Sequence, residues 1–467
     1  MKRGPTQEHS TLLNQILSRV ARRYRLPIRP EDAIHREHHG VASRLASIIE
    51  RVRETVVSGR QPDAALKKQF LDTLARLIHD AMLDDEGDSA FQAMTLRHGA
   101  PRVREYASLA ARSDPDRRAV LALVNTMAHP ARQERTGDAS LRAALAAVHD
   151  AASEQAWTRL HTLLRELARI GATSTDTDVS RPAAALLEHP ALARLQRLEA
   201  LRADEQVGRY LKLWEKNGPR TGSDEALREG ARSRRRGAAV EALAAKALTV
   251  LAEGLNEVET TGAIYRVVTS LRVPAAILNG RERAKSEWDA VLLGRSAGVS
   301  DDQGWDVCLL LEAKASADAA ATDLPRLLRG LEVLSQAEEE SLHSFQTTQG
   351  EVRLSGASLR RLSTDEARVA ATVLYCSDAP AGQPRLLSAA ARMQLLSTPA
   401  SLDFAAALAD GSVADPASLE PVWLELLGSP RWSAVLHQYP TLRQARELMV
   451  HVDDLRFPCP SRRQSHG

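Results

Sequence analysis

The stretch WDVCLLLEAK, Trp305–Lys314, decides the fold of the second half of the chain. Its run of apolar residues, 307–311, indicates a strand that is covered on both faces of a sheet. Glu312 and Lys314 follow directly, and residues two apart in a strand point to the same side. Because a buried carboxylate without a partner is very unfavourable, we expect Glu312 to pair with a cation. That cation is either Lys314, as a simple ion pair at the strand end, or a metal ion.

A second acidic residue, Asp289, heads the preceding predicted strand, although aspartate is depleted in strands. The connection Gly294–Gly304 is polar and glycine-rich, which favours a hairpin centred near Val299. Such a hairpin would place Asp289 opposite about residue 309, near Glu312 across the sheet. A symmetric loop would place the two acidic side chains on opposite faces of the sheet. They share a face only if the ladder register or one bulge allows it.

A third acidic residue, Glu241, lies in a helix predicted from about Asp224 to Leu251 and ending near Gly254. It stands two residues before the apolar Leu243, yet taken alone it is typical of a solvated helix position. A basic cluster precedes it. The cluster suits contact with a phosphate backbone and equally suits a solvated linker surface; it consists of Arg232, Arg234, Arg235 and Arg236.

Apolar periodicity and turn residues predict a mixed α/β chain in three regions. Residues 1–221 are expected to form a helical domain for targeting or partner contact, up to a Gly/Pro/Ser cluster at 217–224. Residues 222–400 are expected to form a domain of helix, three strands, helix and strand, and residues 401–467 a helical extension with a polar tail. The expected strands are Ile264–Leu271, Glu287–Leu293, Trp305–Ala313 and Val369–Tyr375, with a helix from Asp323 to about Glu340.

Within the first region, apolar residues spaced three and four apart predict helices over 12–20 and 66–77. A longer pattern predicts one helix over 139–170, capped near Ser140 and stopped at Gly171. The polar stretch 172–180 is expected to be a loop. No fixed-period repeat indicates a solenoid.

Composition limits the classes of function. The chain has 467 residues, of which 43% are hydrophobic, and this excludes global disorder. Its formal net charge of +2 excludes a surface that is basic throughout, as a protein coated for nucleic-acid binding would have. Arginine outnumbers lysine 54 to 8, so each lysine stands at a position where arginine would be the default cation.

Cysteine and histidine usage gives little sign of structural metal or disulfides. Cys308, Cys376 and Cys459 are too few for a disulfide framework or, alone, a four-ligand zinc site. His35, His38 and His39 lack the HExxH order, which argues against zinc. The N-terminal segment has no apolar stretch typical of a signal peptide, and no window reaches about 18 apolar residues. We therefore expect a cytoplasmic protein without a membrane span.

Together these residues resemble the PD-(D/E)XK nuclease superfamily, which has the restriction-endonuclease-like fold, over roughly residues 231–379. The resemblance implies a helix carrying a glutamate, a three-stranded meander, a helix and a further strand. The acid on the second strand would be Asp289, the Glu-x-Lys on the third would be Glu312–Lys314, and the helical acid would be Glu241 after the Arg-Gly step at 236–237. Trp288 stands where the name-giving proline would be.

The resemblance implies Mg²⁺- or Mn²⁺-dependent hydrolysis of phosphodiester bonds in DNA. Oxygen ligands suit Mg²⁺, and Asp289, Glu312 and the Ala313 carbonyl would provide them. Lys314 would position the attacking water or neutralise charge on the phosphate, a task for which a compact ammonium differs from the guanidinium of arginine. Glu241 would orient water or help to hold a second ion.

Two other functions compete with this one. A nuclease-like fold used only to bind nucleic acid or a partner protein would keep the architecture without the chemistry. A metabolic enzyme such as a sugar-phosphate synthase is the least favoured, because a barrel needs about eight strand–helix alternations and residues 1–216 show none. No GxxxxGK[ST], GxGxxG or GxSxG motif is present. The helical region could join two copies of the chain or dock a partner protein.

Overall fold

A computed structural model of the chain describes residues 5–34, 40–84, 86–173, 177–218, 224–259, 262–281, 283–296, 303–382 and 384–455. These residues form two compact units, one made of 1–76, 221–395 and 420–467, and the other of 77–220 and 396–419. The expected mixed α and β class with an N-terminal helical region is confirmed. The restriction-endonuclease-like topology and the domain ranges 1–221, 222–400 and 401–467 stay predictions.

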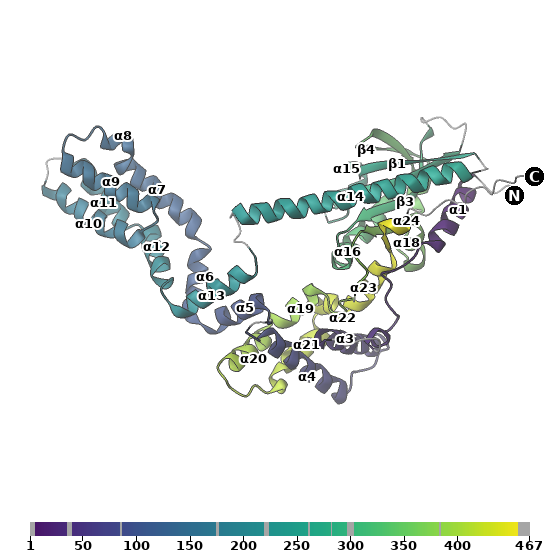
Figure 1. The fold of residues 1–467 in the computed structure, drawn as a ribbon, viewed down its shortest axis with the longest axis horizontal. Helices are drawn as coiled ribbons and strands as arrows, with labels where there is room; N and C mark the ends of the chain where they lie inside the picture. The colour runs from purple at the N-terminus through teal and green to yellow at the C-terminus, as the bar shows by residue number, and fades with distance from the viewer. Residues whose placement is uncertain are drawn as a thin grey trace, which may run out of the picture. The chain divides into compact units, whose positions relative to one another are not determined.

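The second unit is built from helices around two apolar cores (Figure 1). One core lies among α7, α9, α10, α11 and α12, and the other among α5, α6, α12 and α13. The helices of this unit are α5 (Ser89–Gly99), α6 (Pro101–Ala110), α7 (Ser113–Ala128), α8 (Pro130–Gln133), α9 (Ala139–Ser153), α10 (Trp157–Thr173), α11 (Thr177–Leu187), α12 (Pro190–Leu201), α13 (Glu205–Lys216), α20 (Pro399–Ala409) and the 3-10 helix η2 (Pro416–Leu419).

Three expectations for residues 139–180 are wrong. The single long helix is two helices, because Gln155 adopts a left-handed φ of 59° between α9 and α10. The N-cap of α9 is Asp138, whose carboxylate accepts the N–H groups of Ser140 and Leu141. Helix α10 runs past Gly171 to Thr173, and α11 begins at residue 177 inside the stretch expected to be a loop.

The first unit contains a seven-stranded mixed sheet in the order β5-β4-β1-β2-β3-β6-β7. Strands β1, β2 and β3 form an antiparallel meander, β4 and β5 form a hairpin antiparallel to β1, and β3, β6 and β7 run parallel. The strands are β1 (Ala263–Arg272), β2 (Glu287–Ser296), β3 (Asp306–Ala313), β4 (Leu342–Thr347), β5 (Gly350–Ser355), β6 (Val373–Ser377) and β7 (Met449–His451).

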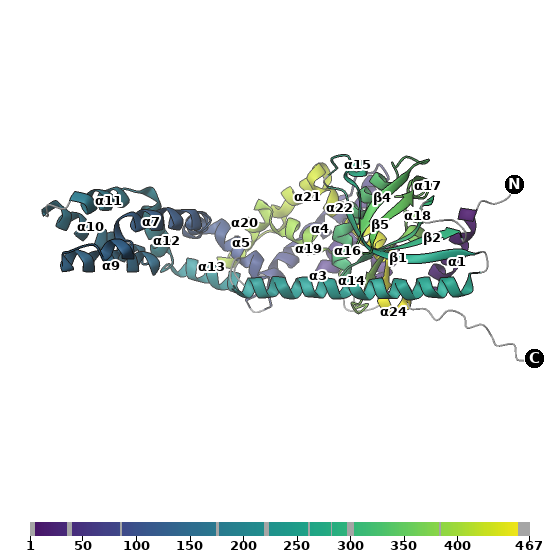
Figure 2. The same ribbon diagram turned by 90° about the horizontal axis from the view of Figure 1, so that it is seen from above.

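Helices cover both faces of this sheet, as the uninterrupted apolar run in β3 predicts. Figures 1 and 2 show α14 (Asp224–Val258) lying along one face, which α1 (Pro5–Arg19) also covers. Helices α16 (Ala317–Leu334) and α23 (Gln438–Glu447) pack on the other face. Leu309 and Leu311 point towards α14, whereas Leu310 points towards α16. Glu312 therefore continues the α16 side of the strand.

The remaining helices of the first unit are shorter or peripheral. They are α2 (Pro30–Ile34), α3 (Val41–Val57), α15 (Ala275–Leu278), α17 (Gly356–Arg360), α18 (Glu366–Thr372), α19 (Ala389–Leu396), α21 (Glu420–Gly428), the 3-10 helix η3 (Pro430–Trp432), α22 (Ser433–Leu436) and α24 (Val452–Leu455). Helix α4 (Ala64–Ala81) contains the point at which the chain passes from the first unit to the second. The helices predicted over 12–20 and 66–77 are confirmed as α1 and α4.

Several expected bounds in this unit are corrected. The last predicted strand, 369–375, is helix α18 up to Thr372 and strand only from Val373. Helix α16 begins at Ala317 and ends at Leu334, and α14 continues past Gly254 to Val258. The hairpin β4–β5 was not expected, and β7 interrupts the region expected to be wholly helical. The polar tail, Cys459 and the three histidines His35, His38 and His39 lie outside the described residues.

Candidate functional site

A bulge in β3 sets the register of the two acidic residues. The ladder pairs Leu293 with Val307 but Leu292 with Leu309, so Cys308 is the extra residue. Beyond the bulge the ladder ends at the pair Ala290 and Leu311, and the same register continued by one step would put Asp289 opposite Glu312. The expected pairing of Asp289 with residue 309 is therefore wrong. Because of the bulge, both acidic residues belong to the same face of the sheet, whereas a symmetric hairpin would place them on opposite faces.

Two hydrogen bonds join the ends of β2 and β3 at this point. The Asp289 N–H donates to Glu312 Oε1 at 3.4 Å, and the Ala313 N–H donates to Asp289 Oδ2 at 2.8 Å. The N–H and C=O groups of one strand residue point to the same neighbouring strand. The Ala313 carbonyl is therefore directed towards β2, the side on which the Asp289 carboxylate lies.

Glu312 is fully buried, and two lysines compensate its charge. Its Oε2 lies 2.6 Å from Lys285 Nζ and 3.4 Å from Lys314 Nζ. Burial, followed by the nearby Asp289 carboxylate, raises the pKa of Glu312 to about 7, although both lysines act to lower it. Removal of the carboxyl group from water is thus the main cause of this raised pKa.

Lys314 is held between β3 and α16. Its Nζ lies 3.4 Å from Glu312 Oε2 and 3.3 Å from Asp323 Oδ2, and the Tyr375 hydroxyl donates to the same Asp323 oxygen at 3.2 Å. Burial acts to lower the pKa of Lys314. The surrounding carboxylates, Glu312 and Asp323 foremost, outweigh this effect and raise that pKa above its usual value. Lys314 is therefore a fixed, charged ammonium group.

Glu241 lies on α14 and is exposed. Its pKa is raised, first by partial desolvation and then by the Asp289 carboxylate, while Lys314 acts to lower it. Glu241 is therefore near enough for the charges of Asp289 and Lys314 to shift its pKa. Within the described residues it is not joined to them by a hydrogen bond or an ion pair. The structure thus brings Asp289, Glu312, Ala313 and Lys314 into direct contact and places Glu241 at their margin.

The four arginines of the basic cluster lie on α14 before its first fully buried residue, Val240. Arg232, Arg234 and Arg235 are exposed. Arg236 instead forms a two-pronged ion pair with Asp378, at 2.5 and 2.7 Å, beyond the end of β6. The first three side chains are exposed and have contacts only within α14, such as Arg232 Nη1 at 3.6 Å from Glu229 Oε2, among the contacts of the described residues. The fourth fixes the helix to the sheet.

Sequence reasoning missed three residues that surround Glu312. They are Lys285, which precedes β2, Asp323 on α16 and Tyr375 on β6. The scarcity of lysine is the one signal that pointed to Lys285. Asp323 and Tyr375 carry no such signal, because an acid in a helix and an aromatic residue in a strand are ordinary.

The donor set fits a single hard divalent cation. In the described ranges, no three His, Cys, Asp or Glu side chains lie close enough together to hold a metal ion. Two acidic residues, Asp289 and Glu312, do lie in contact, with Ala313 beside them, and Mg²⁺ suits one or two carboxylates with other oxygens and water. Lys285 competes for Glu312, so the site is compatible with one ion but already contains a cation.

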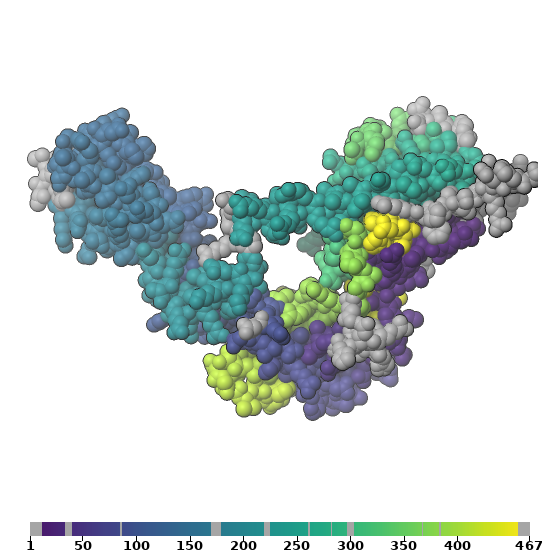
Figure 3. Space-filling model, viewed as in Figure 1, coloured from purple at the N-terminus to yellow at the C-terminus, as the bar shows by residue number. Residues whose placement is uncertain are grey.

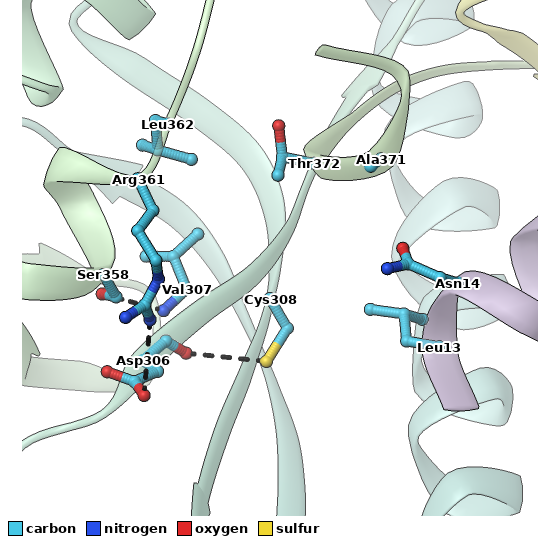
Figure 4. A pocket seen from close by; sticks show the side chains of 10 residues that line it. All are labelled: Leu13, Asn14, Asp306, Val307, Cys308, Ser358, Arg361, Leu362, Ala371 and Thr372. Atoms are coloured by element: carbon cyan, nitrogen blue, oxygen red, sulfur yellow. Dashed lines mark hydrogen bonds and ion pairs between the residues drawn. The ribbon is translucent and has the colours of Figure 1, made fainter. Parts of the chain in front are cut away.

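A separate cavity of about 210 Å³ lies beside the bulge, between the start of β3 and helices α1, α17 and α18 (Figure 4). Arg361 pairs with Asp306 at 3.7 Å on one side of it, and Cys308 lines the middle. Burial raises the pKa of the Cys308 thiol to about 12, so this thiol is not a nucleophile near neutral pH. None of the proposed site residues lines this cavity.

Comparison of the chain with protein-family models, curated proteins and solved structures finds no match. Within the described part of the chain, no helix is both long and apolar enough to cross a membrane. The function therefore has to be argued from the geometry of the site.

Proposed function

We propose that this protein is a metal-dependent phosphodiesterase that acts on DNA. The observation that carries the proposal is the hydrogen-bonded contact of Asp289 with Glu312 at the ends of β2 and β3, with Lys314 in contact with Glu312. Acids on adjacent strands, a backbone carbonyl and a fixed ammonium group are the parts needed to hold a hard cation against a phosphate. This arrangement also matches the order implied by the PD-(D/E)XK resemblance.

Each residue has a distinct role in this proposal. Asp289, Glu312 and the Ala313 carbonyl would hold the Mg²⁺ or Mn²⁺ ion. The chemistry that the ion supplies is polarisation of a phosphoryl oxygen and a lowered pKa of water. Lys314, held by Glu312 and Asp323, orients the attacking water and offsets negative charge on the phosphate. Glu241, exposed and with a raised pKa, accepts a hydrogen bond from that water.

The N-terminal half of α14 supports DNA as the substrate. Figure 3 shows this half of the helix projecting from the sheet of its own unit. Arg232, Arg234 and Arg235 are exposed there, and such a row of guanidinium groups suits the phosphate backbone of a duplex. Because the chain as a whole is nearly neutral, a local surface of this kind is needed for DNA binding.

Plasmid cleavage with Mg²⁺ tests the proposal. Wild-type protein is compared with Glu312→Ala and Lys314→Ala, and with Lys246→Ala as a control at an exposed lysine of α14. We expect nicking by the wild type and the control, and a loss of at least about 100-fold in both site variants. Equal activity in all four proteins would show that the site is wrongly assigned.

One observation favours a second candidate, a nuclease-like protein that binds nucleic acid without cleaving it. Lys285 Nζ lies 2.6 Å from Glu312 Oε2 and thereby neutralises a ligand that a metal would need. DNA binding that depends on Arg232, Arg234 and Arg235 without any cleavage would identify this candidate. A homodimer, a partner protein docked through the helical region and a cytoplasmic location stay predictions.

A further inference from the structure

Of the two described cations in direct contact with Glu312, Lys285 is not used in the proposed mechanism, whereas Lys314 is. Its side chain is only 7% exposed, and its Nζ lies closer to Glu312 Oε2 than Lys314 Nζ does, 2.6 Å against 3.4 Å. It precedes β2, whereas Lys314 follows β3. Two ammonium groups from different segments thus share one carboxylate oxygen.

The surroundings of Lys285 hold it in this place. Its Nζ lies 5.6 Å from the centre of the Trp288 ring, within the range of a cation–π contact. Helix α16 comes so close that a Cβ added at Gly330 would lie 2.7 Å from Lys285 Cβ and 3.2 Å from its backbone nitrogen. The absence of a side chain at Gly330 therefore lets Lys285 approach the helix and enter the buried site.

The two oxygens of Glu312 are consequently not equivalent. Oε2 is shared by both lysines, whereas Oε1 accepts only the weak bond of 3.4 Å from the Asp289 N–H among the contacts of the described residues. The Asp289 backbone lies against Oε1, and the Asp289 carboxylate accepts the Ala313 N–H. The Oε2 side of Glu312 is thus filled by ammonium groups, whereas the Oε1 side faces Asp289.

We propose that Lys285 is a built-in counter-cation of Glu312, which lets the site fold without metal and limits it to a single divalent ion on the Asp289 side. This inference rests on the proposed function for the presence of a metal site. Lys285 is a positioning residue, since it acts on the ion through Glu312. In its absence Glu312 would lose its nearer cation and attract the divalent ion more strongly.

Calorimetric titration of the metal-free full-length chain with Mn²⁺ alone tests the number of ions. We expect one Mn²⁺ per wild-type chain. Two ions per chain would overturn the inference and leave the proposed function standing. No binding by the wild type together with one ion bound by Lys285→Met would contradict both the proposed function and the single-ion site of this inference. No binding by either protein would overturn both.

The Lys285→Met variant separates a counter-cation from a residue needed only for structure. We expect its Tm in EDTA to fall by roughly 5–15 °C, because Glu312 loses its nearer partner. We also expect Mn²⁺ to bind about 10- to 100-fold more tightly, because a competing positive charge is gone. A purely structural lysine predicts the reverse, weaker Mn²⁺ binding in a damaged site, and that result would overturn the inference.

Three further variants keep the test decisive. Lys285→Arg retains the charge and should return the Mn²⁺ affinity to within a few-fold of wild type. Lys246→Met, at an exposed lysine of α14, should change neither Tm nor affinity. If Lys285→Met does not fold, the double variant Lys285→Met/Glu312→Gln should fold and recover the Tm in EDTA, because both charges are removed together. A double variant that is no more stable than Lys285→Met would contradict the pairing.

Discussion

Gly294 in β2 lies opposite Asp306, and its missing side chain leaves room for the sulfur of the bulged Cys308. A Cβ built at this position would lie 2.7 Å from Cys308 Sγ and 3.4 Å from the Tyr265 ring. The bulge, and with it the alignment of Asp289 with Glu312, thus depends on a glycine several residues away from either acid.

Replacing Gly294 by alanine should therefore destabilise the protein by about 1–3 kcal/mol, because the new methyl group overlaps the sulfur. The double variant Gly294→Ala/Cys308→Ala should regain most of this loss, since the sulfur is then absent. Urea unfolding curves of the wild type, both single variants and the double variant measure the coupling. Additive effects of the two substitutions would show that the sulfur does not limit position 294.

The residues of the site differ in how far the sequence predicts them. Glu312 and Lys314 were predictable, because two charges two apart after an apolar run must leave a buried strand together. The contact of Asp289 with Glu312 was not predictable. It depends on a one-residue bulge at Cys308, and no turn residue in the sequence indicates that bulge. Lys285 was missed because its approach depends on the packing of α16, which local patterns do not contain.

Among the elements, apolar content decided which strands were predictable. Strands β1, β2 and β3 lie in the interior of the sheet, and their apolar runs identified them. The hairpin β4–β5 forms one edge, and most residues of β4 are polar or partly exposed, so it has no such run. The short β7 begins two residues after α23 ends and has only three residues, too few for an alternating pattern to show in the sequence.

Two helix glycines give opposite predictions for the same substitution. Gly330→Ala in α16 should lower the free energy of unfolding by about 1–3 kcal/mol, because the added Cβ meets the backbone of Lys285. Gly237→Ala in α14 meets nothing within 4 Å and should raise it by up to about 1 kcal/mol, because alanine favours helix. Chemical denaturation measures both. A stabilising Gly330→Ala would show that α16 does not press on Lys285.

The exposed arginines of α14 lead to a prediction for DNA binding. The triple variant Arg232→Ala/Arg234→Ala/Arg235→Ala should bind duplex DNA more weakly and with a shallower dependence on salt, by up to about 0.9 in logarithmic slope per lost phosphate contact. Fluorescence anisotropy at several salt concentrations measures this slope. An unchanged slope would show that the DNA does not contact these three arginines.

Arg236→Ala does not test DNA contact in the same way, because it breaks the ion pair with Asp378 that fixes α14 to the sheet.

Of the two units of the molecule, the helical one contains an ion pair of its own, which joins helices α7 and α12. Asp116 on α7 accepts two hydrogen bonds from Arg194 on α12, at 2.6 and 2.8 Å, and is 7% exposed. The Arg194 guanidinium lowers the pKa of Asp116. The carboxylate thus stabilises the unit at pH values above its unfolded pKa of about 3.9, and this contribution is lost as the pH falls through the lower folded-state pKa.

Asp116→Asn should accordingly destabilise the helical unit by about 1–2 kcal/mol at pH 7, because a partly buried charge-assisted pair is lost. The difference between the wild type and the variant should shrink as the pH falls from 7 through the lowered folded-state pKa of Asp116, because the wild-type carboxylate then becomes protonated. Urea unfolding followed by circular dichroism at a series of pH values checks this. Asp114→Asn, at an exposed carboxylate paired with Arg117, serves as the control and should change little.

The position of β7 affects the order in which the chain can fold during synthesis. The helical unit takes most of its residues from 77–220, whereas the core shared by α1, α14 and the sheet also includes Val450 and Leu455. A nascent chain that has not yet reached β7 leaves β6 as an open edge, a surface prone to pair with other chains. The ribosome must therefore deliver the chain as far as Leu455 before the sheet that carries Glu312 and Lys314 is complete.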